Sequence, residues 1–324
     1  MKQSKNFDLI QKNTSDLIDL WMYNFARNIP DFLNGNNVKQ LSGFKNVKLS
    51  IKNHRPKNSA VVIGGGPSVE KNNHLKILSN SNYNGAIVCT DRMLIPCLKN
   101  GITPKKFPKF YVLSIEPKDV TVKLYDDKII KKYSKGISAV LSTCIKHEVV
   151  ELCKKNGLKI FWFHPLIDDF RKLESVNKIM NMMSKSDKNP KGFPGMQTGG
   201  NVGVFSWIFS WAILGCSPVA LIGLDLGYHV DTPLENIRHY RDYLKAYNNN
   251  KSKAGKFFKK ITNVDLKIKA LSDPIFDFYR EAFLDLVVRT PKWVRTINAT
   301  EGGSLFGKRI ENMKFTDFLT LVNS

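Results

Sequence analysis

Three consecutive glycines follow a short apolar run in this chain and lead into a proline and a serine. Glycine lets the backbone come close to an anion, and a serine can cap a helix whose free N–H groups point at a ligand. We therefore expect a phosphate-binding turn between a strand and a helix, with a tight turn that binds no ligand as the alternative. The turn consists of Gly64, Gly65, Gly66, Pro67 and Ser68.

Two later segments also end an apolar run in residues that suit a polar ligand. The segment 221–225 ends at Asp225, and the segment 296–303 carries Asn298, Thr300 and Glu301 before two more glycines. Parallel strands end at one edge of a sheet, where open α/β proteins bind ligands. If the three apolar runs are parallel strands, these residues line one ligand-binding crevice. The alternatives are a cap at Asp225 and a simple glycine turn in the last segment.

Further polar residues stand where an apolar run ends or begins. Asp91 and Glu116 each follow such a run, and Gly199, Gly200 and Asn201 open an almost wholly apolar helical segment.

Three histidines are candidates for a general base, since histidine exchanges its proton near neutral pH. His229 and His239 lie in or next to a polar segment after Asp225, and His164 precedes a proline at an expected strand end. A surface or stacking role without catalysis is the alternative for each histidine.

The elements that must position these residues follow from the hydrophobic pattern. From residue 60 onward, apolar runs of strand length alternate with helical patterns, which is typical of a doubly wound, mainly parallel, Rossmann-like α/β fold. The expected strands are 60–63, 86–89, 110–114, 137–141, 159–163, 219–222 and 294–297.

Two segments stand outside this alternation. Apolar residues recur with a helical period over 8–34 and stop near Pro30, which predicts a helical N-terminal extension at 1–57 before an α/β domain at 58–324. The segment 232–274 is charged, aromatic and rich in lysine, with no strand period. We expect a helical insertion that acts as a lid or acceptor platform over the crevice.

Charge favours anionic partners. Lys and Arg total 50 and Asp and Glu total 28, so the net charge is +22. This balance suits phosphorylated substrates or an anionic membrane surface. The absence of an arginine-rich arm or zinc-finger spacing argues against specific nucleic-acid binding. The dense segment Lys251–Lys269 is interpreted as a solvated face, with peripheral membrane contact as the minority interpretation.

Cysteine usage and hydropathy predict a cytoplasmic protein. The five cysteines are odd in number and widely spaced in apolar surroundings, which favours reduced buried thiols over disulfides or a metal cage. The first residues lack the apolar core of a signal peptide, and the longest apolar stretch is too short to cross a bilayer.

Four blocks, taken in order over residues 59–319, resemble the 6-hydroxymethylpterin diphosphokinase-like (MptE-like) family, which includes motility accessory factors that glycosylate flagellin. The first is the glycine turn, and the second is Cys-Thr-Asp-Arg at 89–92 with Lys-Asn-Gly-Ile-Thr-Pro at 99–104. The third is Thr-Gly-Gly-Asn-Val-Gly at 198–203, which runs into Leu-Gly-Cys-Ser-Pro-Val-Ala-Leu-Ile-Gly-Leu-Asp-Leu at 214–226. The fourth is Asn-Ala-Thr-Glu-Gly-Gly at 298–303.

Resemblance to the pterin kinases of this family implies pyrophosphoryl transfer from ATP to 6-hydroxymethyl-dihydropterin. They hold Mg²⁺ with paired aspartates at the end of a strand, and the corresponding strand here is followed by Glu116 and Asp119 without an Asp-x-Asp pair. Glu116 and Asp119 are then the expected metal ligands. The departure weakens this activity without excluding it.

The other branch is similar to bacterial sialyltransferases that use a CMP-activated nonulosonic acid and need no metal. That likeness implies that Gly65, Gly66, Pro67 and Ser68 bind the nucleotide phosphate and that a histidine accepts the proton of the acceptor hydroxyl. It also implies that Asp91 and Glu116 lie at adjacent strand ends near the donor sugar or ribose. Main-chain contacts to the donor are implied for Gly199, Gly200 and Asn201. The acceptor is a small molecule, a glycan or a protein. We favour this glycosyl transfer over the kinase, and a nucleotide- or anionic-surface-binding module without turnover remains a third hypothesis.

Overall fold

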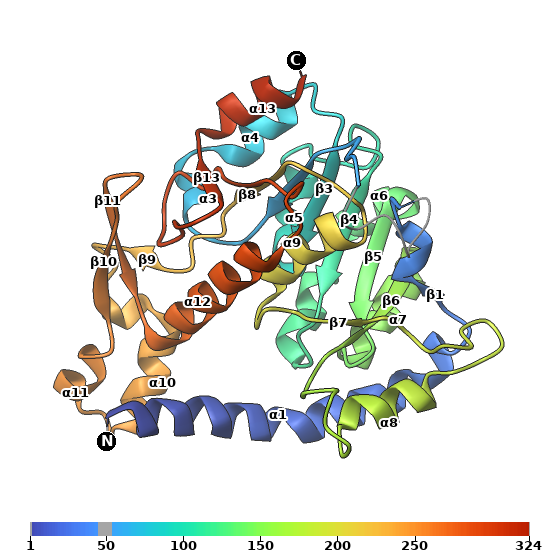
Figure 1. Cartoon of the computed structure of the whole chain (residues 1–324), viewed down its shortest axis with the longest axis horizontal. Coiled ribbons are helices and arrows are strands. Elements are labelled where there is room, and N and C mark those ends of the chain that lie inside the picture. Colours follow the sequence, from blue (N-terminus) through green and yellow to red (C-terminus); the bar gives the residue numbers. More distant parts are fainter. Residues whose placement is uncertain (1, 45–53, 324) are drawn as a thin grey trace.

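The structure is a computed structural model that describes residues 2–44 and 54–323, with only the backbone described for residues 2–16 and 238. The described part contains a large sheet flanked by helices on both faces and a small antiparallel sheet at one side (Figure 1).

The large sheet has ten described strands, and every pairing in it is parallel. The order is β1-β6-β5-β4-β3-β2-β8-β12-β13, with β7 paired to β6. The strands are β1 (Asn36–Asn37), β2 (Ala60–Ile63), β3 (Ala86–Thr90), β4 (Phe110–Ser114), β5 (Ile137–Ser142), β6 (Lys159–Pro165), β7 (Gly195–Met196), β8 (Val219–Ile222), β12 (Thr296–Asn298) and β13 (Ile310–Asn312). The doubly wound α/β fold predicted from the sequence is thus confirmed.

The central strands form because they are apolar on both faces, as parallel strands between helices must be. In β2, Val61 and Ile63 belong to one core cluster, and Ala60 and Val62 belong to the other. The first cluster packs against α1 (Lys2–Phe32), α4 (His74–Asn80), α5 (Asp91–Lys99), α6 (Lys128–Tyr133), α7 (His147–Asn156) and α13 (Phe315–Asn323). The second packs against α9 (Val202–Ala212) and α12 (Pro274–Arg289).

The strand order reverses beside β2. The chain runs from β2 outward through β3, β4, β5 and β6, and then returns to place β8, β12 and β13 on the other side of β2. In open α/β sheets a ligand crevice lies outside the carboxyl ends of the two strands at such a reversal. The fold therefore places the expected crevice after β2 and β8.

The N-terminal segment is joined to the sheet. Its helix α1 continues past Pro30 to Phe32, and β1 extends the sheet by pairing with β6. Two fully enclosed asparagines of α1 donate hydrogen bonds to carbonyls that follow β4 and β5: Asn24 to Pro117 at 3.0 Å, and Asn28 to residues 143 and 145 at 3.1 and 2.8 Å. The helix thus lies across the carboxyl edge of this half of the sheet (Figure 1).

The insertion at 232–274 is only partly helical, which corrects the sequence-based prediction. Its first half holds α10 (Arg238–Ala246) and α11 (Lys251–Gly255), and its second half is the hairpin β10 (Lys259–Asn263) and β11 (Ile268–Ser272). The hairpin pairs with β9 (Tyr228–His229). The sequence did not predict this hairpin because exposed lysines interrupt the alternation of apolar residues that marks a strand. In addition, the partner strand β9 lies outside the hairpin in sequence.

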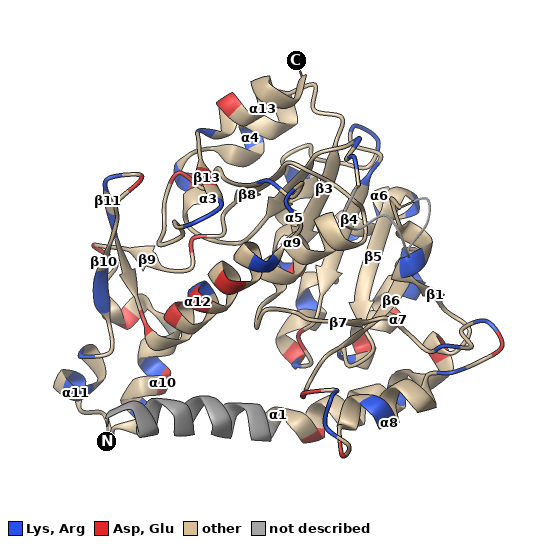
Figure 2. Cartoon of the chain, in the orientation of Figure 1, with Lys and Arg blue, Asp and Glu red and all other residues tan. Residues whose placement is uncertain are grey.

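Charge and thiol placement agree with the composition. Lysines and arginines are spread over most of the described elements, including those of the insertion (Figure 2). All five cysteines are buried and free, as expected from the sequence. Among the described residues, no helix is long and apolar enough to cross a membrane.

Candidate functional site

The turns after β2, β8 and β12 meet at the carboxyl edge of the sheet. The Ser68 hydroxyl donates a hydrogen bond of 2.8 Å to Asp225 Oδ2, and the Gly66 N–H donates one of 2.8 Å to the Gly223 carbonyl. A methyl group built on Gly66 would lie 1.9 Å from Asp225 Oδ2, and one on Gly302 would lie 3.3 Å from the Ser68 Cβ. Glycine is required at Gly66 because the carboxylate of Asp225 takes the space.

Ser68 does not cap the following helix, contrary to the prediction from sequence. The short helix α3 (Ser68–Lys71) begins at Ser68 itself, after Pro67 in the αR conformation with no side-chain cap. The Ser68 hydroxyl donates its hydrogen bond to Asp225, so the Asp225 carboxylate lies at the start of α3. Burial raises the pKa of Asp225 to about 6, against the opposing effects of the Ser68 hydrogen bonds and the positive charge of Lys71.

At the glycine turn, Gly65 is exposed while Gly64 is buried. A methyl group on Gly65 would lie 2.9 Å from Arg92 Cδ, so the stem of Arg92 packs beside Gly65. The neighbouring Asp91 follows β3 and is buried. Burial raises its pKa to about 6, and the negative charge of Glu116 after β4 adds to the rise.

The two metal ligands expected for the kinase hypothesis have different surroundings. Asp119 is 87% exposed and forms an ion pair of 2.7 Å with Lys146. The carboxyl group whose charge acts on Asp91 is that of Glu116. Glu116 is thus close enough to Asp91 for its charge to act on that carboxyl group. Asp119 instead forms its ion pair with Lys146.

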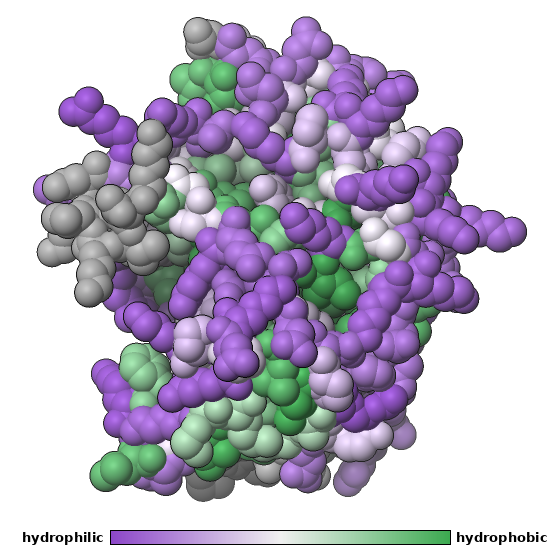
Figure 3. Space-filling view, turned by 90° about the vertical axis from the view of Figure 1, so that its right-hand side faces the viewer, coloured by the Kyte–Doolittle hydropathy of each residue, from purple (hydrophilic) through white to green (hydrophobic). Residues whose placement is uncertain are grey.

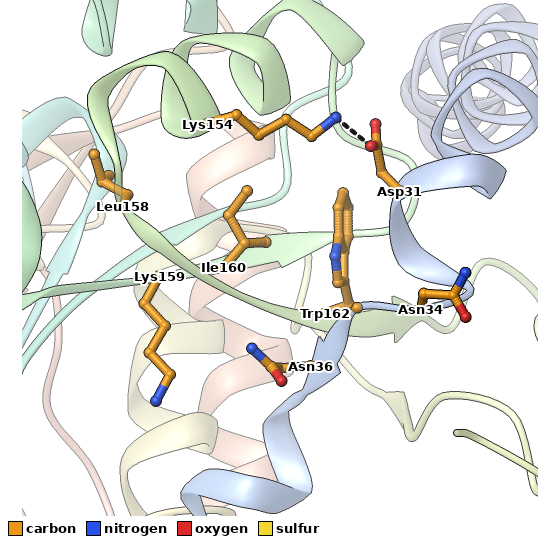
Figure 4. Close-up of a pocket in the computed structure, with 9 residues that line it drawn as sticks. Asp31, Asn34, Asn36, Lys154, Leu158, Lys159, Ile160 and Trp162 are labelled. Atoms are coloured by element: carbon orange, nitrogen blue, oxygen red, sulfur yellow. Dashed lines mark hydrogen bonds and ion pairs between the residues drawn. The ribbon is translucent and has the colours of Figure 1, made fainter. Parts of the chain in front are cut away.

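In the described part of the chain, three metal-ligating side chains come together at Asp31, His147 and Glu151, between α1 and α7. Lys154 forms ion pairs with both Asp31 and Glu151 there. A cavity of about 330 Å³ adjoins this network beside β6, and the ion pair Asp31–Lys154 lines it (Figure 4). Both features lie four strands away from β2, so they are separate from the glycine turns.

The turn before α9 leads into a helix start that packs beside the residues after β8. Gly199 and Gly200 have φ of +61° and +84°, and the Asn201 side chain caps α9 by accepting a hydrogen bond of 2.9 Å from Val204 N–H. A methyl group on Gly203 would lie 2.4 Å from Leu224, the residue before Asp225. The N-terminus of α9 therefore packs directly on the loop that carries Asp225.

His239 lies against a buried carboxylate. Its Nδ1 lies 2.6 Å from Asp273 Oδ2, and the Tyr228 hydroxyl lies 3.1 Å from the same oxygen. Asp273 is fully buried and accepts hydrogen bonds from the N–H groups of Ile275 and Phe276 with its other oxygen. Because a carboxylate only accepts, Nδ1 carries the proton, and Nε2 holds the lone pair that a base needs.

The other two histidines have different environments. His229 is exposed, with Nε2 at 3.3 Å from Lys71 Nζ and Nδ1 at 3.5 Å from Asp231. His164 is buried between Thr143 and Asn177, and burial lowers its pKa to about 4. His164 is therefore part of the core and is neutral near physiological pH.

Two residues assigned to ligand binding from the sequence are instead fully buried. The Asn298 amide donates to the Leu305 carbonyl at 2.8 Å, and the Thr300 hydroxyl donates to the Leu221 carbonyl at 3.3 Å. They shape the loop and cannot touch a ligand in this conformation. Glu301 is half-buried and binds the Phe315 N–H at 3.0 Å and His74 at 3.3 Å, so it ties the loop to α13 and α4.

The sequence analysis did not identify Lys71, Tyr228 or Asp273. Lys71 places a positive charge next to Asp225 and His229. Two signals were available for these residues. A lysine in the first turn after a glycine loop suits an anion, and an Asp-Pro pair at 273–274 is typical of a capped helix start.

Comparison with solved structures gives a likeness to the MAf glycosyltransferase from Magnetospirillum magneticum AMB-1, with a TM-score of 0.53 at 13% identity. The match covers 85% of this chain and 37% of that chain, so this chain spans little more than a third of that protein, and the likeness concerns the fold. A search of curated proteins found no match. The family model described as 6-hydroxymethylpterin diphosphokinase MptE-like matches residues 23–231, more than half of the chain. The chain therefore belongs to the MptE-like family.

Proposed function

We propose that this protein is a transferase that binds a nucleotide-activated donor in the crevice after β2 and β8, with a CMP-linked nonulosonic acid as the donor. One observation carries the proposal: the glycine turn, Asp225 and the start of α9 converge where the strand order reverses. Membership of the MptE-like family and a fold shared with a glycosyltransferase support a transferase.

The phosphate of the donor would enter from the exposed side of Gly65 and Pro67. The seat next to Gly66 already holds the carboxylate of Asp225. A phosphate beside it needs a counter-charge, which Lys71 supplies from the end of α3. The same lysine would stabilise the negative charge that develops on the phosphate as the donor bond breaks.

His239 would act as the general base. In the transfer, the acceptor oxygen forms a bond to the anomeric carbon, the bond from that carbon to the CMP phosphate oxygen breaks, and His239 Nε2 takes the acceptor proton. Asp273 holds the imidazole in the required tautomer and stabilises the cation formed. Tyr228, three residues after Asp225 in the sequence, has its hydroxyl 3.1 Å from both His239 Nδ1 and Asp273 Oδ2. The acceptor is a small molecule, a glycan or a protein, and this route uses no metal.

The second candidate is ATP-dependent pyrophosphorylation of a hydroxymethylpterin, which the description of the matching family favours. Mg²⁺ would then be held by Asp91 and Glu116. Burial raises the pKa of Asp91 and the charge of Glu116 adds to the rise, so a cation would stabilise both carboxylates in their charged forms. Mg²⁺ would supply charge neutralisation on the phosphates. Asp119 is engaged by Lys146 and is replaced by Asp91 in this hypothesis.

Calorimetric titration separates the candidates. We expect CMP to bind in the presence of EDTA, and Gly66→Ala to abolish this binding because its methyl group displaces Asp225. Gly255→Ala is the matched control, since its methyl group meets no atom closer than 3.6 Å. Binding of ATP only with Mg²⁺, lost in Glu116→Gln, would refute glycosyl transfer and favour the kinase. Absence of binding by both nucleotides would refute both.

Turnover requires a further measurement. A coupled assay that detects free CMP measures the hydrolysis of a CMP-nonulosonate. It reports cleavage of the donor even when the acceptor is unknown. We expect His239→Ala to lower acceptor-dependent CMP release and Asp273→Asn to shift its pH profile. CMP binding without any release, even with extracts as acceptor source, would favour the third hypothesis of a binding module.

A further inference from the structure

The cavity beside β6 lies where one edge of the large sheet loses its neighbouring strand. We call it the β6 cavity. β1 pairs with β6 only through Asn36 and Asn37, which lie opposite Phe161 and Trp162. In the described part of the chain, the stretch of β6 before Phe161 therefore has no strand beside it on this edge. The space left there measures about 330 Å³ and is enclosed by the ends of α1 and α7 (Figure 4).

The Trp162 indole has a polar edge that the fold does not use. Trp162 is 2% exposed, and its ring packs edge-to-face on Phe32 with centroids 5.9 Å apart. Among the described residues its Nε1–H has no hydrogen-bond partner, and the side chain lines the cavity (Figure 4). A methyl group on Gly35 would lie 2.7 Å from Nε1, so glycine at this position leaves the N–H edge uncovered. Because a buried indole N–H usually has a partner, this one is available to a ligand.

Further polar groups on the wall of the cavity are not used within the described part of the fold. The side-chain amides of Asn34 and Asn36 donate to and accept from no other described residue. Each amide offers two N–H donors and one carbonyl acceptor. Lys159 lies with its Nζ 5.1 Å from the centre of the Phe161 ring and has no carboxylate partner among the described residues. The wall thus presents both donors and acceptors to a ligand.

Acidic and basic side chains occur around the cavity in similar number. At one end Lys154 forms ion pairs with Asp31 and Glu151, and Lys159 lies at the other end (Figure 4). Lys188 donates to a backbone carbonyl of the segment after α1 at 2.9 Å. Neither sign dominates, so the wall does not select an ion. Lys154 also neutralises both carboxylates of the metal-ligating cluster, which therefore serves as part of the wall.

A ligand can reach the cavity from solvent. Asn34 and Lys159 are exposed, Asn36 is half-buried, and the Lys154 side chain is 46% exposed. β1 and β6 lie toward the side of the molecule that faces the viewer in Figure 3. On that side, apolar surface is visible in recesses between protruding hydrophilic side chains (Figure 3).

We infer that the β6 cavity binds one neutral monosaccharide ring. A hydroxyl group both donates and accepts hydrogen bonds, so a ring with several hydroxyls suits a wall that mixes N–H donors, amides and a carboxylate. The ring carbons would pack on Leu158 and Ile160, which supply the aliphatic part of the wall. A volume of about 330 Å³ lies at the lower end of the range for small-molecule sites. The inference does not depend on the proposed reaction, whose crevice lies four strands away.

Nuclear magnetic resonance of the tryptophan indole N–H groups of the full chain tests the inference. The chain has five tryptophans, and the Trp162 signal is identified by its loss in Trp162→Phe. The protein is titrated separately with glucose, galactose, mannose and N-acetylglucosamine. We expect at least one of them to move the Trp162 signal, with a dissociation constant of the order of 1 mM, and to leave the other four signals in place.

Variants of the wall show whether this binding uses the cavity. Asn36→Ala with Lys159→Met removes two polar groups and should raise the dissociation constant by about tenfold. The matched control is Asn84→Ala with Lys155→Met, which removes an exposed asparagine and an exposed lysine outside the cavity and should leave the constant unchanged. Unchanged positions of the other four indole signals show that each variant keeps its fold.

Four outcomes would overturn the inference. The first is that none of the four sugars moves the Trp162 signal. The second is an equal loss of affinity in the control pair. The third is binding of glucuronate or glucose 6-phosphate without binding of a neutral sugar, because the cavity would then select an anion. The fourth is equal affinity for sorbitol, which carries the hydroxyl groups without the ring. None of these outcomes affects the titration with CMP that tests the proposed function.

Discussion

The burial of Asp225 beside the glycine turn provides the most direct test of this arrangement. Its carboxyl group is buried against Gly66 and accepts the Ser68 hydrogen bond, and its pKa rises from 3.8 to about 6 mainly because burial disfavours the charged form. Asp225→Asn keeps the shape and an oxygen that can accept from Ser68, but it removes the ionised form. The substitution should therefore stabilise the fold at neutral pH.

The magnitude follows from linkage. A rise of about two pKa units corresponds to about 3 kcal/mol of differential free energy. Between about pH 4 and pH 6 the folded protein holds a proton on Asp225 that the unfolded chain has lost, so this group's contribution to stability falls as pH rises. We expect Asp225→Asn to match the wild type near pH 4 and to be more stable by up to about 3 kcal/mol above about pH 7.

Urea unfolding of both proteins across this range gives the assay, with equal m-values as the check on two-state behaviour. His164 and Asp91 titrate in or near the same window, so only the difference between variant and wild type isolates Asp225. Asp187→Asn, on an exposed loop, is the control for surface charge. A stability gain that does not change with pH, or a loss at neutral pH, would refute the reasoning.

Three further predictions use the same measurement. Gly66→Ala should cost more than about 2 kcal/mol because its methyl group would lie 1.9 Å from Asp225 Oδ2, while Gly255→Ala should cost nothing. Asn28→Ala should cost about 2 to 3 kcal/mol because two buried carbonyls lose their donor, and a near-neutral result would show that α1 is not held by these bonds. The pKa of His164 is lowered to about 4 by burial, so the unfolded chain takes its proton first and stability falls as pH drops below about 6.5. His164→Asn should remove about 3 kcal/mol of that acid loss, and an unchanged acid limb would contradict it.

Much of the large sheet was predictable because its central strands are apolar on both faces. Residues 60–63, 110–114 and 219–222 match β2, β4 and β8 to the residue, and the other predicted strands differ only at their ends. The short strands β1, β7 and β13 were missed. They have two or three residues each, and their strand conformation depends on a partner far away in sequence.

The hairpin of the insertion was missed for a related physical reason. Its strands β10 and β11 face solvent on one side, so lysines interrupt the apolar alternation that marks a strand. Asn263, fully buried, donates to the carbonyls of Gly303 and Leu305. The hairpin is thus fixed by contact with the loop after β12, which no local pattern contains.

Residue types and order alone determined the glycine turn, the parallel α/β architecture and the family to which the chain belongs. Only the tertiary structure decided which polar atoms are used within the fold: it placed Asp225 against Gly66, buried Asn298 and Thr300, and joined His239 to Asp273. The physical reason is that a glycine or an apolar run acts on the backbone where it stands. The role of a polar side chain depends on the partners and the burial that distant segments provide.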